Sequence, residues 1–139
     1  MNIKEVSSNS FSFIGDAVYT LAVRKHFVLN KYQASKSLQK MCNQFNSAKG
    51  QTEVFNRLAQ NNFFSEEELE VFKRGRNHIS HIPKNGDKYT YETASGLEAI
   101  VGYLYLTNEK RLNQLLDEVF KEDLKWAKSY MVRILSLKL

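Results

Sequence analysis

Two carboxylates occupy apolar stretches of the sequence in which no other side chain is formally charged. Asp16 is the only charged residue between positions 6 and 23, and Glu98 is the only one between positions 94 and 107. On a helical wheel each acid falls on an apolar strip of its own segment, which predicts that both are buried. A buried carboxylate costs several kcal/mol unless it is neutralised, paired with a cation or bound to a metal.

The two acids together favour one shared metal site. Neither segment contains a histidine or cysteine, and ligands that are all oxygen are typical of a hard cation such as Mg²⁺, with Mn²⁺ as a substitute. Either acid alone could instead meet an arginine or lysine. Gly15, Gly96 and Gly102 lie close to the acids and would let two backbones or a ligand approach closely, although tight helix packing explains them equally well.

Most of the net positive charge lies in one short segment. Residues 73–88 hold an excess of +4 out of a total of +5, because five cations face a single acid, Asp87. The cations are Lys73, Arg74, Arg76, Lys84 and Lys88. A run of charge is often just a solvated surface, yet guanidinium groups, the amide of Asn77 and an intervening glycine are groups that hold phosphate oxygens. A magnesium site beside a phosphate-binding segment describes a phosphodiester hydrolase.

Other residues carry weaker signals. His78 and His81 are three positions apart and could bind zinc, but two further ligands are missing, so contact with solvent or phosphate is the better interpretation. Cys42 fits a small core residue. Tyr19, like three later tyrosines, could stack on nucleic-acid bases, although tyrosines at helical spacing are more often part of a core or an interface.

The elements that must position these residues are predicted to be helices. One proline and six glycines in 139 residues leave few of the turns that an all-β fold requires. A serine-to-glutamate capping box at Ser65 gives the clearest helix start, and the first helix is expected to be central because it is apolar on two sides. The expected helices cover about residues 11–28, 34–45, 47–60, 65–75, 91–106 and 108–120, with a further stripe over 126–135 and a loop over 77–90.

Length and composition indicate one all-α domain over residues 1–139, with about residues 124–139 as a helical extension. A single cysteine excludes an internal disulfide, and the N-terminal residues lack the apolar core of a secretory signal. No apolar run approaches the ~20 residues of a membrane span. We therefore expect a cytoplasmic protein.

Several motifs resemble the ribonuclease III family. Residues 13–18 read Phe-Ile-Gly-Asp-Ala-Val and look like its F-L-G-D-A-V signature, while residues 94–99 align with its second acidic motif, A-D-T-F-E-A. The segments 73–77, 83–85 and 102–106 are more similar to Mini-ribonuclease III, the short bacterial branch that lacks the double-stranded RNA-binding domain. The resemblance covers about residues 10–120, with the motifs in the same order.

The resemblance implies a homodimeric helical bundle that cleaves double-stranded RNA with Mg²⁺ and trims the stem ends of large-subunit (23S) precursor ribosomal RNA. A ribosomal protein is a further expected partner. Carried over by position, Asp16 is the principal catalytic carboxylate and Glu98 the second metal ligand. The loop that embraces the duplex would then contain Lys73, Arg74, Arg76, Asn77 and Lys84.

Two family acids are replaced here, because Ser12 and Ser95 stand where full-length ribonucleases III have a glutamate and an aspartate. Small residues are expected there in the Mini group. The replacements also make an alternative worth testing, a catalytically silent RNA-binding or ribosome-associated module of the same fold. A third hypothesis is a helical adaptor whose basic loop binds an acidic protein. Retention of both Asp16 and Glu98 favours the enzyme.

Overall fold

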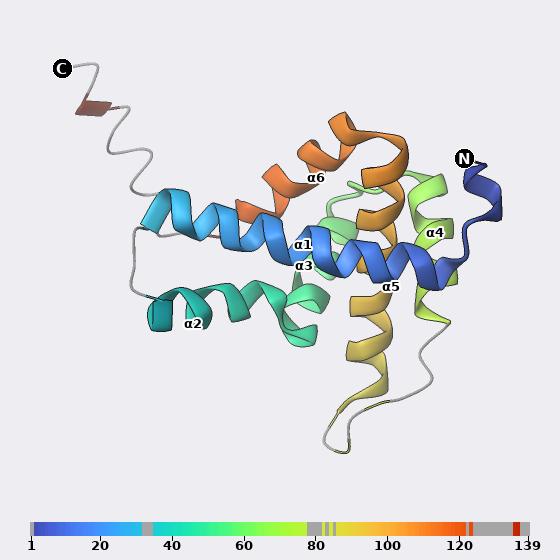
Figure 1. Ribbon diagram of the computed structural model, residues 1–139, viewed down its shortest axis with the longest axis horizontal. Coiled ribbons are helices and arrows are strands. Elements are labelled where there is room, and N and C mark those ends of the chain that lie inside the picture. The colour runs from blue at the N-terminus through green and yellow to red at the C-terminus, as the bar shows by residue number, and fades with distance from the viewer. Residues whose placement is uncertain are drawn as a thin grey trace.

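The computed structural model describes residues 2–31, 35–77, 82, 84, 86–121, 123 and 135–136. A short 3₁₀ turn, η1 (Ile3–Glu5), precedes six α-helices in the described part of the chain. They are α1 (Ser8–Lys31), α2 (Ser35–Asn46), α3 (Ala48–Gln60), α4 (Glu66–Arg76), α5 (Lys88–Thr107) and α6 (Glu109–Phe120). No strand occurs among these residues, which confirms the prediction of an all-α fold (Figure 1).

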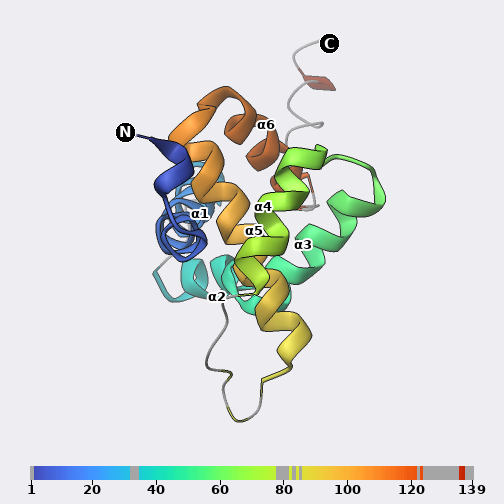
Figure 2. The ribbon, with the colours of Figure 1, turned by 90° about the vertical axis from the view of Figure 1, so that its right-hand side faces the viewer.

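Helix α5 is the centre of the bundle. It packs against α1, α3, α4 and α6, and Figure 2 shows it between α1 on one side and α3 and α4 on the other. Nine of its residues are buried, because apolar side chains surround this helix on nearly every side. The largest fully buried side chains of the core are Tyr19, Val23, Leu58, Leu97, Ile100, Val101, Leu115 and Val119.

The backbones of α1 and α5 touch where they cross. A Cβ atom added at Gly15 would lie 1.7 Å from the carbonyl oxygen of Glu98, and one added at Gly102 would lie 2.0 Å from that of Phe11. Only glycine fits at either position, since the neighbouring atoms belong to backbone that cannot swing away. The crossing therefore places Asp16 and Glu98 at the same level of the bundle.

Helix boundaries follow local side-chain capping. The predicted capping box is present, because the Glu68 amide donates to Ser65 Oγ at 3.1 Å and the Ser65 amide donates to Glu68 Oε1 at 3.0 Å. Helix α5 begins three residues earlier than the expected Tyr91, since Asp87 caps it by accepting from the Tyr89 amide at 3.2 Å.

The position of α1 differs from the prediction. One apolar side of the helix packs inward, but Phe13 is 84% exposed and Leu21 is 67% exposed. Helix α5, not α1, is thus the central helix. Asp16 is also exposed rather than buried, because it lies at the edge between the packed side and the open side of α1.

Some sequence predictions fall outside the described residues. These are His78, His81 and the stripe over residues 126–135 apart from Leu135, which is 56% exposed. The division into one domain with a C-terminal extension remains a prediction. No helix in the described ranges is both long and apolar enough to cross a membrane.

Candidate active site

The structure brings Asp16 and Glu98 together at the crossing of α1 and α5. Their carboxyl groups lie close enough to interact, with Asp16 exposed and Glu98 partly buried. The contact between Gly15 and the Glu98 backbone fixes how closely the two acids approach. One member of the pair therefore faces solvent, while the other lies beneath it.

Burial dominates the electrostatics of this pair. Loss of solvent, together with a smaller contribution from the hydrogen bond and negative charge of Asp16, raises the pKa of Glu98 to about 9, whereas a hydrogen bond from Gln51 opposes the shift. Glu98 accordingly holds a proton at neutral pH in the metal-free protein. A bound cation would favour the ionised form of both acids.

Gln51 of α3 is a site residue that the sequence analysis missed. Its side chain is 3% exposed, contacts the Glu98 carboxyl group, and donates through Nε2 to the Asn46 carbonyl at 3.2 Å. Its Oε1 atom is buried without a hydrogen-bond partner. The available signal was its spacing, because Gln51 lies on the same helical face as the buried Val54, Phe55 and Leu58.

Tyr19 supports the site from below. It is fully buried, and its hydroxyl donates to the Phe45 carbonyl at 3.0 Å, which ties α1 to the end of α2. Burial raises the pKa of the Tyr19 hydroxyl, and the nearby Glu98 raises it further. Tyr19 is therefore a core residue and does not stack on bases.

Ser12 and Ser95 form a link between three helices. Ser12 Oγ donates to the Ser95 carbonyl at 3.1 Å, and the two hydroxyl oxygens lie 3.4 Å apart. Ser95 Oγ donates in turn to the Gly75 carbonyl at 3.1 Å. This link holds the last turn of α4, which carries the basic segment, against α5 one turn before Glu98.

The donor groups fit a divalent cation. In the described ranges, neither Asp16 nor Glu98 forms a salt bridge, so no side-chain cation neutralises the pair there. Two carboxylates beside a carboxamide oxygen that lacks a partner provide hard oxygen ligands. The described residues offer no cluster of three acidic, histidine or cysteine ligands, so water or a phosphate oxygen would complete the coordination.

The predicted phosphate-binding residues lie on the surface at and after the end of α4. Lys73, Arg74, Arg76, Asn77 and Lys84 are all exposed. Lys73 Nζ lies 3.4 Å from Glu70 Oε1, and the Arg76 guanidinium lies 5.9 Å from the centre of the Phe72 ring. The structure thus brings the first four residues to one helix end and leaves Lys84 further along the segment that leads to α5.

Comparisons with known proteins match most of this chain to one family. The family model described as the ribonuclease III domain matches residues 9–109. The chain is 37% identical over 120 residues to the Mini-ribonuclease 3 of Staphylococcus aureus, which covers 85% of this chain and 90% of that protein. It is 41% identical over 108 residues to the Mini-ribonuclease 3 of a Thermoanaerobacter species, covering 76% and 75% respectively.

The fold is also similar to that of a solved structure. An X-ray crystal structure of a Fusobacterium nucleatum protein superimposes with a TM-score of 0.77 at 28% sequence identity. The match covers 88% of this chain and 98% of the other. The arrangement of helices that positions the two carboxylates is thus shared with this protein.

Proposed function

Because this chain belongs to the ribonuclease III family and is an endoribonuclease for double-stranded RNA, we propose that Asp16 and Glu98 are its catalytic residues and bind Mg²⁺. Mn²⁺ would act as a substitute ion. The observation that carries the proposal is the contact between two carboxylates at the α1–α5 crossing, with no side-chain cation paired to either in the described ranges. Glu68, by contrast, is a buried acid with a cationic partner.

Each protein group has a separate task in the proposed mechanism. When bound, Mg²⁺ would lower the pKa of a water molecule and neutralise charge on the phosphate. Asp16 would bind it from the exposed side of the site, while Glu98 must first release its proton. Gln51 acts as a positioning residue, because its hydrogen bond holds the Glu98 carboxyl group in place.

The cations at the end of α4 would bind the phosphates of the duplex. Lys73, Arg74, Arg76 and Asn77 are exposed in or directly after the turn that Ser95 holds against α5, and Lys84 extends the same segment. Phosphate contacts orient an RNA duplex without reading its bases, because its deep major groove hides the base edges. We therefore expect selection by helical shape.

A second copy of the chain is the proposed partner of α1. Phe13, Ala17 and Leu21 are exposed on one side of this helix, close to Asp16 in sequence. Burying such a strip between two subunits would remove apolar surface from water. A homodimer would carry two cleavage sites, one for each strand of a duplex.

The proposed substrate is the precursor of large-subunit (23S) ribosomal RNA. The support is the similarity to proteins named Mini-ribonuclease 3 and the modest net charge of +5, which predicts weak binding to bare duplex. A structured precursor with its bound ribosomal protein would supply the remaining affinity.

Cleavage of a purified RNA duplex with and without Mg²⁺ tests the function. Asp16→Asn should abolish Mg²⁺-dependent cleavage while the far-UV circular dichroism remains unchanged, whereas Asp117→Asn, an exposed acid on α6, should cleave like the parent. Retained cleavage by Asp16→Asn would contradict the assignment. Duplex binding by the parent without cleavage would favour the silent module, and no binding at all would favour the adaptor.

A further inference from the structure

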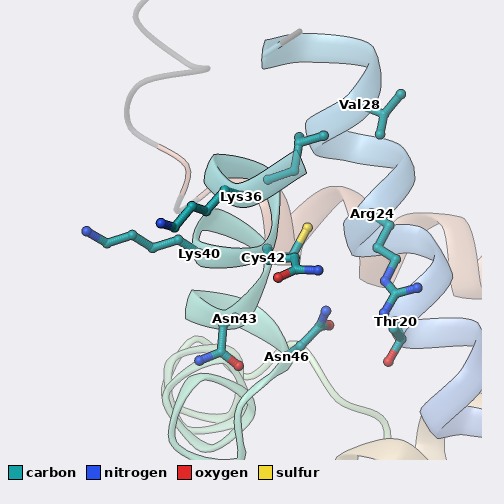
Figure 3. A pocket seen from close by; sticks show the side chains of 10 residues that line it. Thr20, Arg24, Val28, Lys36, Lys40, Cys42, Asn43 and Asn46 are labelled. Atoms are coloured by element: carbon teal, nitrogen blue, oxygen red, sulfur yellow. The ribbon is translucent and has the colours of Figure 1, made fainter. Parts of the chain in front are cut away.

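An open groove of about 810 Å³ lies between α1 and α2. Thr20, Arg24 and Val28 line it from α1, and Lys36, Lys40 and Asn43 are among its residues from α2. Figure 3 shows Arg24 and Thr20 on one wall, the two lysines extending outward from the opposite helix, and Asn46 between them. The groove therefore has walls contributed by two helices, with polar and charged side chains beside apolar ones such as Leu38.

The charge of the groove has one sign. Arg24, Lys36 and Lys40 are exposed, no acid lines the groove, and none of the three forms a salt bridge within the described ranges. Lys36 also lies in the first turn of α2, which contains no acid, and a cation at that end opposes the helix dipole. Such an arrangement costs stability in the isolated chain, and an anionic ligand would remove the cost.

The groove leads away from the carboxylate pair. Asp16, Thr20 and Arg24 follow one another at intervals of four residues, so they share one side of α1, with Arg24 about 12 Å along the axis from Asp16. Asn46 lines the groove from α2, across from Thr20 (Figure 3), and its carbonyl accepts the hydrogen bond from Gln51, which contacts Glu98. A strand whose phosphate lay at Asp16 would therefore continue over Thr20 toward Arg24.

We propose that this groove is a track for the sugar-phosphate backbone of the RNA strand on one side of the cleaved bond. The proposal rests on the proposed function and names a second contact region of the same site, separate from the end of α4. Three cations from two helices line the groove and can bind phosphates, and the Thr20 hydroxyl and Asn43 amide can hydrogen-bond to phosphate or ribose.

The test compares two double variants that lose the same charge. Lys36→Gln/Lys40→Gln removes two groove cations, and Lys25→Gln/Lys110→Gln removes two exposed cations that do not line the groove. Duplex RNA binding is measured for each full-length protein over a range of salt concentrations. The groove variant should bind duplex RNA roughly tenfold or more weakly than the parent at physiological salt. The salt slope, which is the slope of the logarithm of the binding constant against the logarithm of the salt concentration, should be smaller in magnitude by about 1 to 2, since each phosphate contact contributes about 0.9.

The affinity of the control variant for duplex RNA should stay within roughly twofold of that of the parent, with an unchanged salt slope. Arg24→Gln alone should lower the slope by about 0.9. Equal behaviour of the two double variants would overturn the track, even if the parent binds and cleaves RNA. A groove variant that shifts the oligomeric state in light scattering without changing the slope would also overturn it. Failure of the parent to bind duplex RNA would instead refute the proposed function.

Discussion

Glu68 and Glu98 are both withdrawn from solvent on helices, yet their surroundings differ in kind. Glu68 Oε2 lies 2.8 Å from Arg111 Nε, and its Oε1 lies 2.9 Å from Arg111 Nη2. Burial alone would raise the pKa of Glu68, but hydrogen bonds from Arg111 and Ser65 outweigh it and lower the pKa. For Glu98, burial and the neighbouring Asp16 act in the same direction and raise the pKa.

The difference separates an acid that holds the fold together from an acid that is available for chemistry. Arg111 satisfies Glu68 and also donates to the Phe63 carbonyl at 2.7 Å, so this pair connects α6 to the start of α4. Glu98 is buried beside another acid instead, so ionising it costs stability. Substitutions at the two glutamates should therefore have opposite effects on stability.

The largest expected effect on stability is at the paired acid. Glu68→Gln keeps a residue that can form the capping box but leaves Arg111 without its carboxylate, so the free energy of unfolding should fall by about 2 to 3 kcal/mol in urea titrations. Glu70→Gln on the same helix removes only an exposed pair with Lys73 and should cost less than about 0.5 kcal/mol. Equal losses would show that Glu68 contributes no more than a surface charge.

Glu98→Gln should raise the free energy of unfolding, whereas Glu68→Gln lowers it. Because the pKa of Glu98 is raised from 4.5 to about 9, the folded metal-free protein binds more protons than the unfolded chain between these values. Its free energy of unfolding should then fall by about 1 kcal/mol for each pH unit as the pH rises through this window. The variant lacks this dependence, and at pH 7 without metal it should be about 2 kcal/mol more stable than the parent.

Urea titrations in EDTA at several pH values measure this effect. The pH dependence of Asp117→Asn, an exposed acid, serves as the control and should match that of the parent. A Glu98→Gln variant that follows the same pH dependence as the parent would contradict the raised pKa and the coupling to Asp16.

Isolation of charge in the sequence was enough to predict the carboxylate pair. Asp16 and Glu98 stood alone in apolar segments, and the structure places them in contact across the glycine-lined crossing. The predicted burial of Asp16 was wrong, because a helical wheel gives the direction of a side chain but not what covers it. The α1–α2 groove depends on how two helices pack, which periodicity does not determine.

The start of α5 shows a similar limit. A loop was expected over residues 77–90, which include Asp87. The sequence around Asp87 has no regular apolar spacing, so it did not predict that Asp87 caps a helix. Gln51 was overlooked because one amide among apolar side chains resembles an ordinary exposed position. Its spacing from Val54, Phe55 and Leu58 indicated burial, but its contact with Glu98, a residue 47 positions away, depends on how two helices pack, which local spacing does not determine.

Gln51 offers a second test of the difference between Glu68 and Glu98, because it contacts Glu98. Gln51→Leu should lower kcat for duplex cleavage roughly tenfold to a hundredfold, since supporting hydrogen bonds around a metal ligand typically matter by this amount. KM for RNA should not change. The free energy of unfolding should not fall, because the substitution removes a buried oxygen that has no hydrogen-bond partner. Gln60→Leu, an exposed site on the same helix, should retain the parent kcat. A loss confined to stability would make Gln51 a packing residue.

The smallest expected effect on stability is at the exposed cations of α4. Among the described residues, Arg74 and Arg76 form no ion pair like that between Glu68 and Arg111. Arg74→Gln/Arg76→Gln should weaken duplex binding roughly tenfold and flatten its salt dependence by about 1 to 2 units of slope, because each lost phosphate contact removes about 0.9. The Tm of this variant should be close to that of the control variant Lys25→Gln/Lys110→Gln, since both arginines are exposed. An unchanged salt slope would show that the end of α4 does not contact phosphate, and the track beside α1 would then carry the electrostatic part of binding alone.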